Sequence, residues 1–369
     1  MKLKVCHICS YYENILFDLL VSNQSGFTDP RVFFYKLKGA PQQYDKDYVD
    51  EVGCFSQIDR LFFFVKARKA FQKYQELYGG QKFDLVFAHS LFTNGYVAYL
   101  AHRKYGVPYV VMVQNTDLNA FYKYKPYLSG IANTILKNAS RVIFASPSYQ
   151  TELLEKHVPR KLYSAISQKC TVIPYGIEDL FFEKNEPEGK RINDGKIHII
   201  CVGLICRNKN QTRLAEAIDR LNKRGYNIHL TVIGKEEGAD VSAKLQSYPF
   251  VSLLPYMDKE KLKQEYRKSD LFVLVSITET FGLVYAEALS QGLPIIYSRG
   301  QGFDGQFEEG CIGYAADATD IRSIEETIEK AIGNLDALKP KTETAAEKFK
   351  WDRITALYHD MYTDILRRP

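Results

Sequence analysis

Short apolar stretches alternate with longer amphipathic segments along almost the entire chain, and this alternation restricts the fold more than any other feature. Apolar runs of this length are typical of buried parallel strands, and the segments between them are typical of helices. In one such segment Leu214, Ile218 and Leu221 recur at helical spacing, and Gly225 follows as a stop signal. The alternation predicts an α/β fold with helices on both faces of parallel sheets. The predicted strands are 4–10, 84–90, 109–115, 141–146, 170–176, 197–203, 228–234, 252–256, 271–276 and 294–300.

The alternation forms two series, and residues 181–196 lie between them. This segment is charged, contains Gly and Pro and has few apolar residues, which is typical of a linker. We therefore expect two doubly wound, Rossmann-like domains joined by one hinge. Ligands of such sheets bind beyond the carboxyl ends of the strands, so the predicted site is a cleft that both domains face.

Cysteine content and hydropathy argue against a disulfide-rich secreted protein and against a membrane-spanning one. The chain has seven cysteines, an odd number, and Cys6 and Cys9 fall inside the first predicted strand without a second pair or a histidine cluster. We expect buried free thiols and a reducing, cytoplasmic location. No apolar run reaches the ~18 residues of a transmembrane helix, and the start of the chain lacks the pattern of a signal peptide.

The net charge of +5 is unevenly distributed. Residues 1–183 contain 22 Lys and Arg against 16 Asp and Glu, whereas the remainder contains 27 against 28. The first half is therefore expected to meet something anionic. The excess is too modest for a nucleic-acid-binding protein, and no nucleic-acid recognition module is present.

The stretch ETFGLVYAE, residues 279–287, places two glutamates in an apolar region. With a turn at Gly282, Glu279 is expected on the loop after a strand and Glu287 on the following helix. Glutamate is rarely buried without a partner. One interpretation is a loop-tip and a helix-surface carboxylate; the interpretation we favour places both in a cleft, as acceptors for a polyhydroxyl ligand. The helix start would offer backbone N–H groups to a phosphate, and these belong to Phe281, Gly282 and Leu283.

A second stretch with candidate ligand-binding residues, VGLICRNKN, follows the first strand of the second series. Gly203 allows a ligand to approach the backbone closely. Arg207, Lys209 and Asn210 crowd the start of the next helix, where cations oppose the helix dipole. An anionic ligand would explain cations at that position; two solvated loop cations are the alternative.

Several segments together resemble the retaining, GT-B-fold glycosyltransferases of family four. SITETFGLVYAEALSQGLPII is similar to the family's E-x7-E signature, VIPYGIEDLF (172–181) to the segment before the hinge, and VGLICRNKN to the G-R-L-x-x-x-K-G loop. LTVIGKEE, YMDKEKLKQEYRKSDLFVLVS and FKWDRITALYHDMY (349–362) resemble three further segments, the last being the closing helix. The order and spacing of these segments are specific for the family. The resemblance implies an acceptor domain of residues 1–183 plus 351–369 and a nucleotide-sugar donor domain of residues 184–350.

The family transfers a sugar from a nucleoside-diphosphate sugar with retention of the anomeric configuration. The resemblance implies that Glu279 holds sugar hydroxyls, Glu287 holds the ribose and Lys209 holds the donor diphosphate. The family's arginine usually follows the glycine, where this chain has Leu204, and Arg207 is the candidate to supply its charge. Fixed cations aimed at the departing diphosphate stabilise the transition state, and no Asp-x-Asp pair stands at a strand end. We therefore expect neither a metal nor another cofactor.

Three residues of the first domain occupy positions that the resemblance relates to the donor sugar. His89 ends a predicted strand where the family often has a histidine, and a packed or solvent-facing histidine is the alternative. The next strand ends VQNTD where many relatives read F-H-G-x-D, so Gln114 replaces the family's histidine and Asp117 is kept. Glutamine cannot transfer a proton at neutral pH, so Gln114 is expected to orient the sugar. The resemblance implies a front-face substitution, in which the leaving phosphate takes the acceptor's proton.

Two kinds of surface segment complete the candidate site. The glycine-rich loop 298–310 either approaches the donor phosphates or is an ordinary surface loop. Residues 60–78 and 119–128 combine aromatic residues with Lys and Arg, which suits an anionic membrane surface or a lipid-linked acceptor. The alternative is an amphipathic helix in which Phe62 and Val65 pack on the sheet. We expect peripheral attachment to the cytoplasmic face of the plasma membrane.

The hypothesis from the sequence is a metal-independent, retaining glycosyltransferase that moves a sugar from a UDP- or GDP-sugar to a lipid-linked or glycan acceptor in surface polysaccharide or glycoconjugate synthesis. Two alternatives are an epimerase or hydrolase of nucleotide sugars on the same fold and a non-catalytic subunit that binds a sugar nucleotide. Glu279, Glu287 and Lys209 argue against the last alternative, whereas Leu204 and Gln114 keep it open. An epimerase needs no acceptor, so product analysis without one distinguishes it.

Overall fold

The computed structural model describes residues 2–12, 15–183 and 194–367. These residues form two compact units, one from the described parts of 1–145, 149–173 and 355–369, the other from those of 146–148 and 174–354. The boundaries placed by sequence, after residues 183 and 350, lie near those of the units, which fall after 173 and 354. Helices α5 (Pro147–Glu152) and α13 (Trp351–Arg367) each begin in unit 2 and continue in unit 1.

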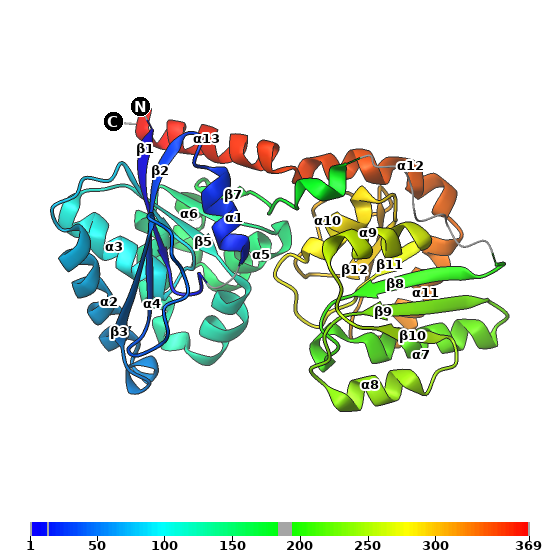
Figure 1. The fold of residues 1–369 in the computed structure, drawn as a ribbon. Helices are drawn as coiled ribbons and strands as arrows, with labels where there is room; N and C mark the ends of the chain where they lie inside the picture. The colour runs from blue at the N-terminus through cyan, green and yellow to red at the C-terminus, as the bar shows by residue number, and fades with distance from the viewer. Residues whose placement is uncertain (1, 13–14, 184–193, 368–369) are drawn as a thin grey trace. The chain divides into compact units, whose positions relative to one another are not determined.

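Unit 1 contains a seven-stranded sheet in the order β3-β2-β1-β4-β5-β6-β7, and every neighbouring pair is parallel (Figure 1). The order reverses between β1 and β4, so this is a doubly wound sheet. The strands are β1 (Leu3–Cys9), β2 (Thr28–Leu37), β3 (Val49–Phe55), β4 (Leu85–Ala88), β5 (Tyr109–Val113), β6 (Arg141–Phe144) and β7 (Cys170–Val172). The α-helices wholly in unit 1 are α1 (Ile15–Asn23), α2 (Phe63–Tyr78), α3 (Thr93–Tyr105), α4 (Ser129–Asn138) and α6 (Arg160–Ser167).

Alternate residues of β1 and β2 serve two separate cores, one on each face of the sheet. Cys6 and Phe33 belong to the large cluster that α2, α3 and α4 cover. Cys9 and Phe34 belong to a smaller cluster with Phe17 of α1. Cys6 and Cys9 are buried free thiols, which confirms the interpretation of the CxxC pair as core residues.

The sequence prediction missed β2 and β3 and, in unit 2, the short strand β13 (Gly313–Ala316). Strand β2 contains Pro30, which normally argues against a central strand, but here it precedes the buried run Val32–Tyr35. Strand β3 is an edge strand that is largely half-buried and carries Asp50 and Glu51. Its pattern is therefore too polar to be recognised as a buried strand.

Unit 2 contains a six-stranded parallel sheet in the order β10-β9-β8-β11-β12-β13 (Figure 1). The order reverses between the neighbouring strands β8 and β11, so a ligand is expected at the carboxyl ends of these two strands. The strands are β8 (Ile197–Val202), β9 (Ile228–Ile233), β10 (Val251–Leu254), β11 (Leu271–Val273), β12 (Ile295–Ser298) and β13 (Gly313–Ala316). The α-helices are α7 (Gln211–Lys223), α8 (Ala239–Gln246), α9 (Lys259–Lys268), α10 (Leu283–Ser290), α11 (Ile321–Ile332) and α12 (Leu335–Ala346).

Two predictions for unit 2 can be compared directly with its elements. Helix α7 buries Leu214, Ile218 and Leu221 as the sequence pattern predicted. The predicted linker begins too early, because Phe181 lies in the short helix η5 (Asp179–Phe182), is buried and packs near the ring of Tyr266. Most of the remaining linker, 184–193, lies outside the described residues. No helix in the described part of the chain has the length and apolar run needed to cross a membrane.

Candidate functional site

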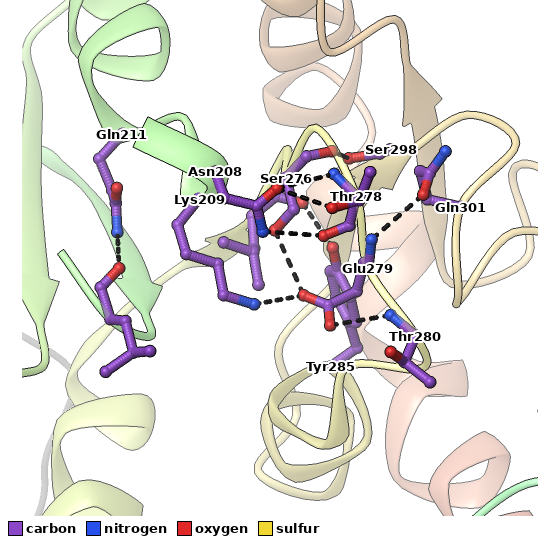
Figure 2. A network of polar contacts seen from close by, with 12 residues as sticks. Asn208, Lys209, Gln211, Ser276, Thr278, Glu279, Thr280, Tyr285, Ser298 and Gln301 are labelled. Atoms are coloured by element: carbon purple, nitrogen blue, oxygen red, sulfur yellow. Dashed lines mark hydrogen bonds and ion pairs between the residues drawn. The ribbon is translucent and has the colours of Figure 1, made fainter. Parts of the chain in front are cut away.

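Two loops of unit 2 meet where the strand order reverses, and each contributes a charged side chain to one contact. The loop after β8 ends in the short helix η6 (Arg207–Lys209), and the loop after β11 carries Glu279. Lys209 Nζ lies 2.6 Å from Glu279 Oε2, and both side chains are largely buried. Figure 2 shows this ion pair at the centre of a network of polar contacts. The structure thus brings together a cation and a carboxylate that the sequence places 70 residues apart.

Glu279 is held from several directions. Its Oε2 also accepts a hydrogen bond from the hydroxyl of Ser276 at 3.2 Å, and its backbone N–H donates to Oε1 of Gln301 at 3.1 Å (Figure 2). The backbone N–H of Gly302 donates to the carbonyl of Glu279 at 3.0 Å. The start of the glycine-rich loop 298–310 is therefore packed against the Glu279 loop and supports it.

The η6 loop is fastened to the Glu279 loop by two asparagines. Asn208 donates to the carbonyl of Thr278 at 3.0 Å and accepts from its hydroxyl at 2.8 Å. Asn210 is buried with φ of 62°, and its side-chain NH2 donates to the carbonyls of Val275 and Ala318 at 3.0 and 2.7 Å. Asparagine tolerates this left-handed backbone conformation better than most residues. These contacts fix the position of Lys209 relative to Glu279.

The turn between Glu279 and α10 requires glycine. Gly282 has φ of +80°, and a Cβ there would meet the ring of Tyr285 at 2.4 Å. Next to it, Phe281 is buried, with its ring centroid 5.7 Å from that of Phe303. The turn places Glu279 on the loop and Glu287 on the helix, as predicted. Among the described residues, no backbone hydrogen bond is formed by the N–H groups at the helix start, which are those of Phe281, Gly282 and Leu283.

Glu287 lies on the buried side of α10 and is only 2% exposed. One carboxylate oxygen pairs with the ammonium group of Lys259, and the other accepts from the hydroxyl of Tyr266 at 3.2 Å. Burial raises the pKa of the Glu287 carboxyl above its ordinary value, and the contacts with Lys259 and Tyr266 oppose that rise. The interpretation of Glu287 as a solvated helix-surface residue is therefore wrong.

A cavity of about 210 Å³ lies entirely within unit 2, between the ends of β8 and β9 and the starts of α9 and α10. Its lining includes Gly203, Leu204, Tyr256, Lys259 and Glu287. Ligand sites usually measure roughly 300–1,000 Å³, so this cavity can receive one end of an elongated ligand. Both a carboxylate and an ammonium group line an otherwise largely apolar space.

Arg207 does not join the Lys209–Glu279 pair. Its guanidinium binds Asp240 through Nε at 3.0 Å and Nη2 at 2.9 Å, and the side chain is 86% exposed. Leu204, where the family's arginine usually stands, is also exposed. Lys209 is therefore the cation that the η6 loop places at the candidate site.

In unit 1, Asp117 joins the loops that follow β4 and β5. Its carboxylate is buried and accepts backbone N–H groups of Leu91, Phe92 and Gln114 at 2.9, 3.3 and 2.8 Å. Burial raises the pKa of Asp117 to about 6, although the three hydrogen bonds oppose the rise. This geometry gives Asp117 a role in shaping the loop that contains Gln114, which is itself partly exposed.

His89 is packed inside unit 1. Its Nε2 shares a hydrogen bond with Nδ1 of His7 at 3.1 Å, and its ring lies against those of Phe17 and Phe87. Burial lowers the pKa of His89 well below its ordinary value, and it lowers that of His7 to about 3. Both imidazoles are therefore neutral at neutral pH, and the alternative of a packed histidine describes His89.

Lys259, Tyr266 and Gln301 were not among the candidate residues predicted from sequence. A signal for Lys259 was present, because this cation stands at the first position of α9, where it opposes the helix dipole. The same argument had identified Lys209. No sequence signal pointed to Tyr266 or Gln301, since their partners come from other elements.

The fold and this site define an α/β protein with two parallel, doubly wound sheets and a candidate ligand site at the switch point of the second sheet. Comparison with family models agrees with that description. The model for glycosyl transferases group 1 matches residues 182–348, and the model for Glycosyltransferase Family 4 matches residues 29–179. The chain belongs to the group 1 glycosyltransferases, and its fold is GT-B.

Two sequence relatives and one solved structure are similar to this chain. A D-inositol 3-phosphate glycosyltransferase of Arthrobacter sp. (strain FB24) is 24% identical over 92% of this chain and 84% of its own length. An alpha-monoglucosyldiacylglycerol synthase of Acholeplasma laidlawii is 26% identical over 68% of this chain and 66% of its own length. The structure of Anabaena HepE in complex with UDP-glucose superposes with a TM-score of 0.67, at 14% identity, over 98% of this chain and 100% of that one.

Proposed function

We propose that this glycosyltransferase is a retaining enzyme that uses a nucleoside-diphosphate sugar and needs no metal. The observation that supports the proposal most directly is the Lys209–Glu279 pair at the switch point, next to a cavity lined by Glu287. The cation is suited to bind a diphosphate. The two carboxylates are suited to accept hydrogen bonds from a sugar and from a ribose.

Each charged group has a distinct part in the proposed reaction. Lys209 binds the diphosphate and offsets the negative charge that grows as the glycosidic bond breaks. Glu279 accepts hydrogen bonds from sugar hydroxyls, and Glu287 accepts them from the ribose inside the cavity. The unused N–H groups at the start of α10 add hydrogen bonds to the phosphates. The resemblance supports front-face substitution, in which the departing phosphate takes the acceptor's proton.

A UDP-sugar is the donor that we favour, with a GDP-sugar as the second choice. The complex of HepE with UDP-glucose supports the first, because that protein shares the fold. An acceptor that is lipid-linked or a glycan, in surface polysaccharide or glycoconjugate synthesis, fits relatives that include an alpha-monoglucosyldiacylglycerol synthase. Metal independence follows from Lys209 and the helix start supplying positive charge, and undiminished turnover in EDTA is the expected result.

The decisive experiment compares Lys209→Ala, Glu279→Ala and Arg207→Ala with UDP- and GDP-sugars. We expect kcat to fall by about 10²–10³ in the first two variants, as on removal of one transition-state donor. Arg207→Ala should lose much less, since Asp240 holds that guanidinium. Near wild-type turnover in both Lys209→Ala and Glu279→Ala would overturn the site. Sugar conversion without any acceptor would favour the epimerase or hydrolase, and donor binding without turnover by the purified chain would favour a non-catalytic subunit.

A separate surface of unit 1 supports peripheral attachment to an anionic membrane. The short helix η1 (Ile58–Leu61) and the start of α2 expose five large apolar side chains, although α2 buries Phe63 and Tyr74 against the sheet. The alternative in which Phe62 and Val65 pack on the sheet is therefore wrong, because both are exposed. The η1–α2 surface consists of Ile58, Leu61, Phe62, Phe64 and Val65.

Two cations belong to the segment that forms the η1–α2 surface. Arg60 is exposed within it, and Lys66 is largely buried with its ammonium group 4.5 Å from the centroid of the Phe55 ring. Burial lowers the pKa of Lys66 to about 8. Arg60 and Lys125, which belongs to the aromatic and basic segment 119–128, lower it by smaller amounts. Segment 119–128 also has an exposed aromatic side chain, that of Tyr124. Exposed apolar side chains next to an exposed arginine suit an anionic interface, and we propose the cytoplasmic face of the plasma membrane.

Flotation with vesicles tests this attachment. The protein should rise with vesicles that contain phosphatidylglycerol and stay at the bottom with phosphatidylcholine alone. The double variant Leu61→Ser, Phe62→Ser should stay at the bottom with both. Leu77→Ser is the matched control, since Leu77 is exposed near the other end of α2. Equal flotation of wild type and double variant would contradict the assignment of this surface.

A further inference from the structure

Lys259 lines the same cavity as Glu287 and has no part in the function proposed above. Lys259 occupies the first position of α9, lines the cavity and forms an ion pair with Glu287. Its side chain is about one-third exposed, and its ammonium group also lies 5.4 Å from the centroid of the Phe181 ring. A lysine at a helix N-terminus is electrostatically unfavourable, so its position there calls for a compensating partner.

Glu287 is that partner, and it is constrained on both sides. Lys259 holds one carboxylate oxygen, and the hydroxyl of Tyr266, two turns further along α9, donates to the other at 3.2 Å. One helix thus fixes the orientation of the carboxylate. Each oxygen can accept more than one hydrogen bond, so both stay available to a hydroxyl group that enters the cavity.

We propose that Lys259 is a positioning residue for nucleotide binding: it holds Glu287 as a correctly oriented, charged acceptor at the wall of the cavity. This inference rests on the proposed function, because it assumes that the cavity receives the ribose of a nucleoside diphosphate. Lys259 acts through Glu287 and takes no part in the transfer of the sugar.

The charges around Glu287 explain why a cation is needed. Burial and the nearby carboxylate of Glu178 both favour the protonated form of Glu287 and raise its pKa. Tyr266 from α9 donates to it, and Cys201 of β8 is the further titratable group close to Tyr266. Lys259 is the cation that forms an ion pair with Glu287, and Lys235 is a second lysine in the lining of the cavity. Without Lys259, Glu287 would take up a proton at a higher pH, lose its charge and become a weaker acceptor for ribose hydroxyls.

The test measures binding of UDP and of GDP by calorimetry at several pH values between 6 and 8. Lys259→Met should weaken binding about tenfold at pH 8, as loss of one charge-assisted contact does, and by more at pH 6. Lys259→Arg should bind within about threefold of wild type at each pH. Lys261→Met is the control, because Lys261 lies on the same helix and pairs with Asp258 away from the cavity.

A double-substitution cycle distinguishes positioning from a general effect on folding. In a Glu287→Gln background, Lys259→Met should change binding very little, because its action passes through the carboxylate. This background also avoids a buried unpaired charge, so the double variant should fold where the single one fails. Equal losses from Lys259→Met in both backgrounds, or a loss that is constant with pH, would overturn the inference. Failure of the wild type to bind either nucleotide would overturn the proposed function instead.

Discussion

Lys209 and Glu279 form a largely buried ion pair, with Nζ and Oε2 2.6 Å apart, in the space assigned to the donor. Each residue is thus the other's partner until a ligand enters. A bound diphosphate would attract Lys209, and sugar hydroxyls would donate to Glu279. Ligand binding would therefore replace the contact between Lys209 and Glu279 with contacts to the ligand. Each side chain thus has a partner both with and without the ligand.

The first prediction concerns the stability of unit 2. Lys209→Met should lower the free energy of unfolding by about 2 kcal/mol, because it leaves a mostly buried carboxylate without its cation. The double variant Lys209→Met, Glu279→Gln should recover at least half of that loss. Urea unfolding followed by the fluorescence of Trp351, the single tryptophan of the chain, reports on this unit. Equal destabilisation of the single and double variants would show that the pair is not what stabilises the loops.

The second prediction concerns the approach of the loops after β8 and β9. A Cβ on Gly234 would lie 1.9 Å from the carbonyl oxygen of Gly203. Gly234→Ala must therefore move backbone at the wall of the cavity. We expect a loss of about 2 kcal/mol in the free energy of unfolding, as overpacking typically costs, together with weaker nucleotide binding. Gly333→Ala is the control, since its nearest neighbour would lie 3.7 Å away. Urea unfolding and calorimetric titration with UDP measure the two effects, and equal behaviour of both variants would contradict the prediction.

Much of the fold could be predicted because the buried strands are short, apolar and bounded by clear turn residues. The strands that escaped prediction differ in their cause: β3 is only partly buried and the buried run of β2 follows a proline, whereas β13 is buried but consists of the short, weakly apolar sequence Gly-Tyr-Ala-Ala. The start of the predicted linker at residue 181 was wrong for a different reason. Phe181 packs near Tyr266, and a contact of this kind cannot be read from the composition of a charged segment.

The candidate site was only partly predictable for a similar physical reason. Glu279, Glu287 and Gly282 stand in one stretch whose turn and helix can be read locally. The partners of the two glutamates are distant in sequence, and a charged residue near a helix start does not reveal which partner it will find. Arg207 and Lys209 are two positions apart, yet one binds Asp240 and the other binds Glu279. Their different partners become apparent only in the folded structure of the loop.

The third prediction concerns the loop that carries Lys209. Asn210→Asp replaces the NH2 group that donates to the carbonyls of Val275 and Ala318 with an oxygen. Three oxygens would then face one another in a buried space, and stability should fall by about 3 kcal/mol. Asn210→Gly keeps the left-handed backbone, loses only the side-chain contacts and should cost less. The same fluorescence measurement ranks the two variants, and the reverse order would mean that backbone conformation matters more than the hydrogen bonds.

The fourth prediction concerns the pH dependence of unit 1. Asp117 has a pKa of about 6 in the folded chain, raised by burial from 3.8. Since its folded pKa lies above the unfolded one, its contribution to stability is fully present below about pH 4 and is lost as the pH rises through about 6. Asp117→Asn removes this titration. Relative to wild type, the free energy of unfolding of Asp117→Asn should therefore rise by roughly 3 kcal/mol between pH 4 and pH 7.

The measurement must report on the loops that Asp117 joins. Urea unfolding followed by hydrogen exchange of peptides that cover β4 and β5 meets this need, with exchange rates corrected for their intrinsic dependence on pH. The carboxylate accepts three backbone N–H groups, so Asp117→Asn is expected to be less stable than wild type at pH 4 and to approach it as the pH rises. Parallel stability profiles for the two proteins would mean that Asp117 keeps an ordinary pKa, and that its hydrogen bonds outweigh its burial.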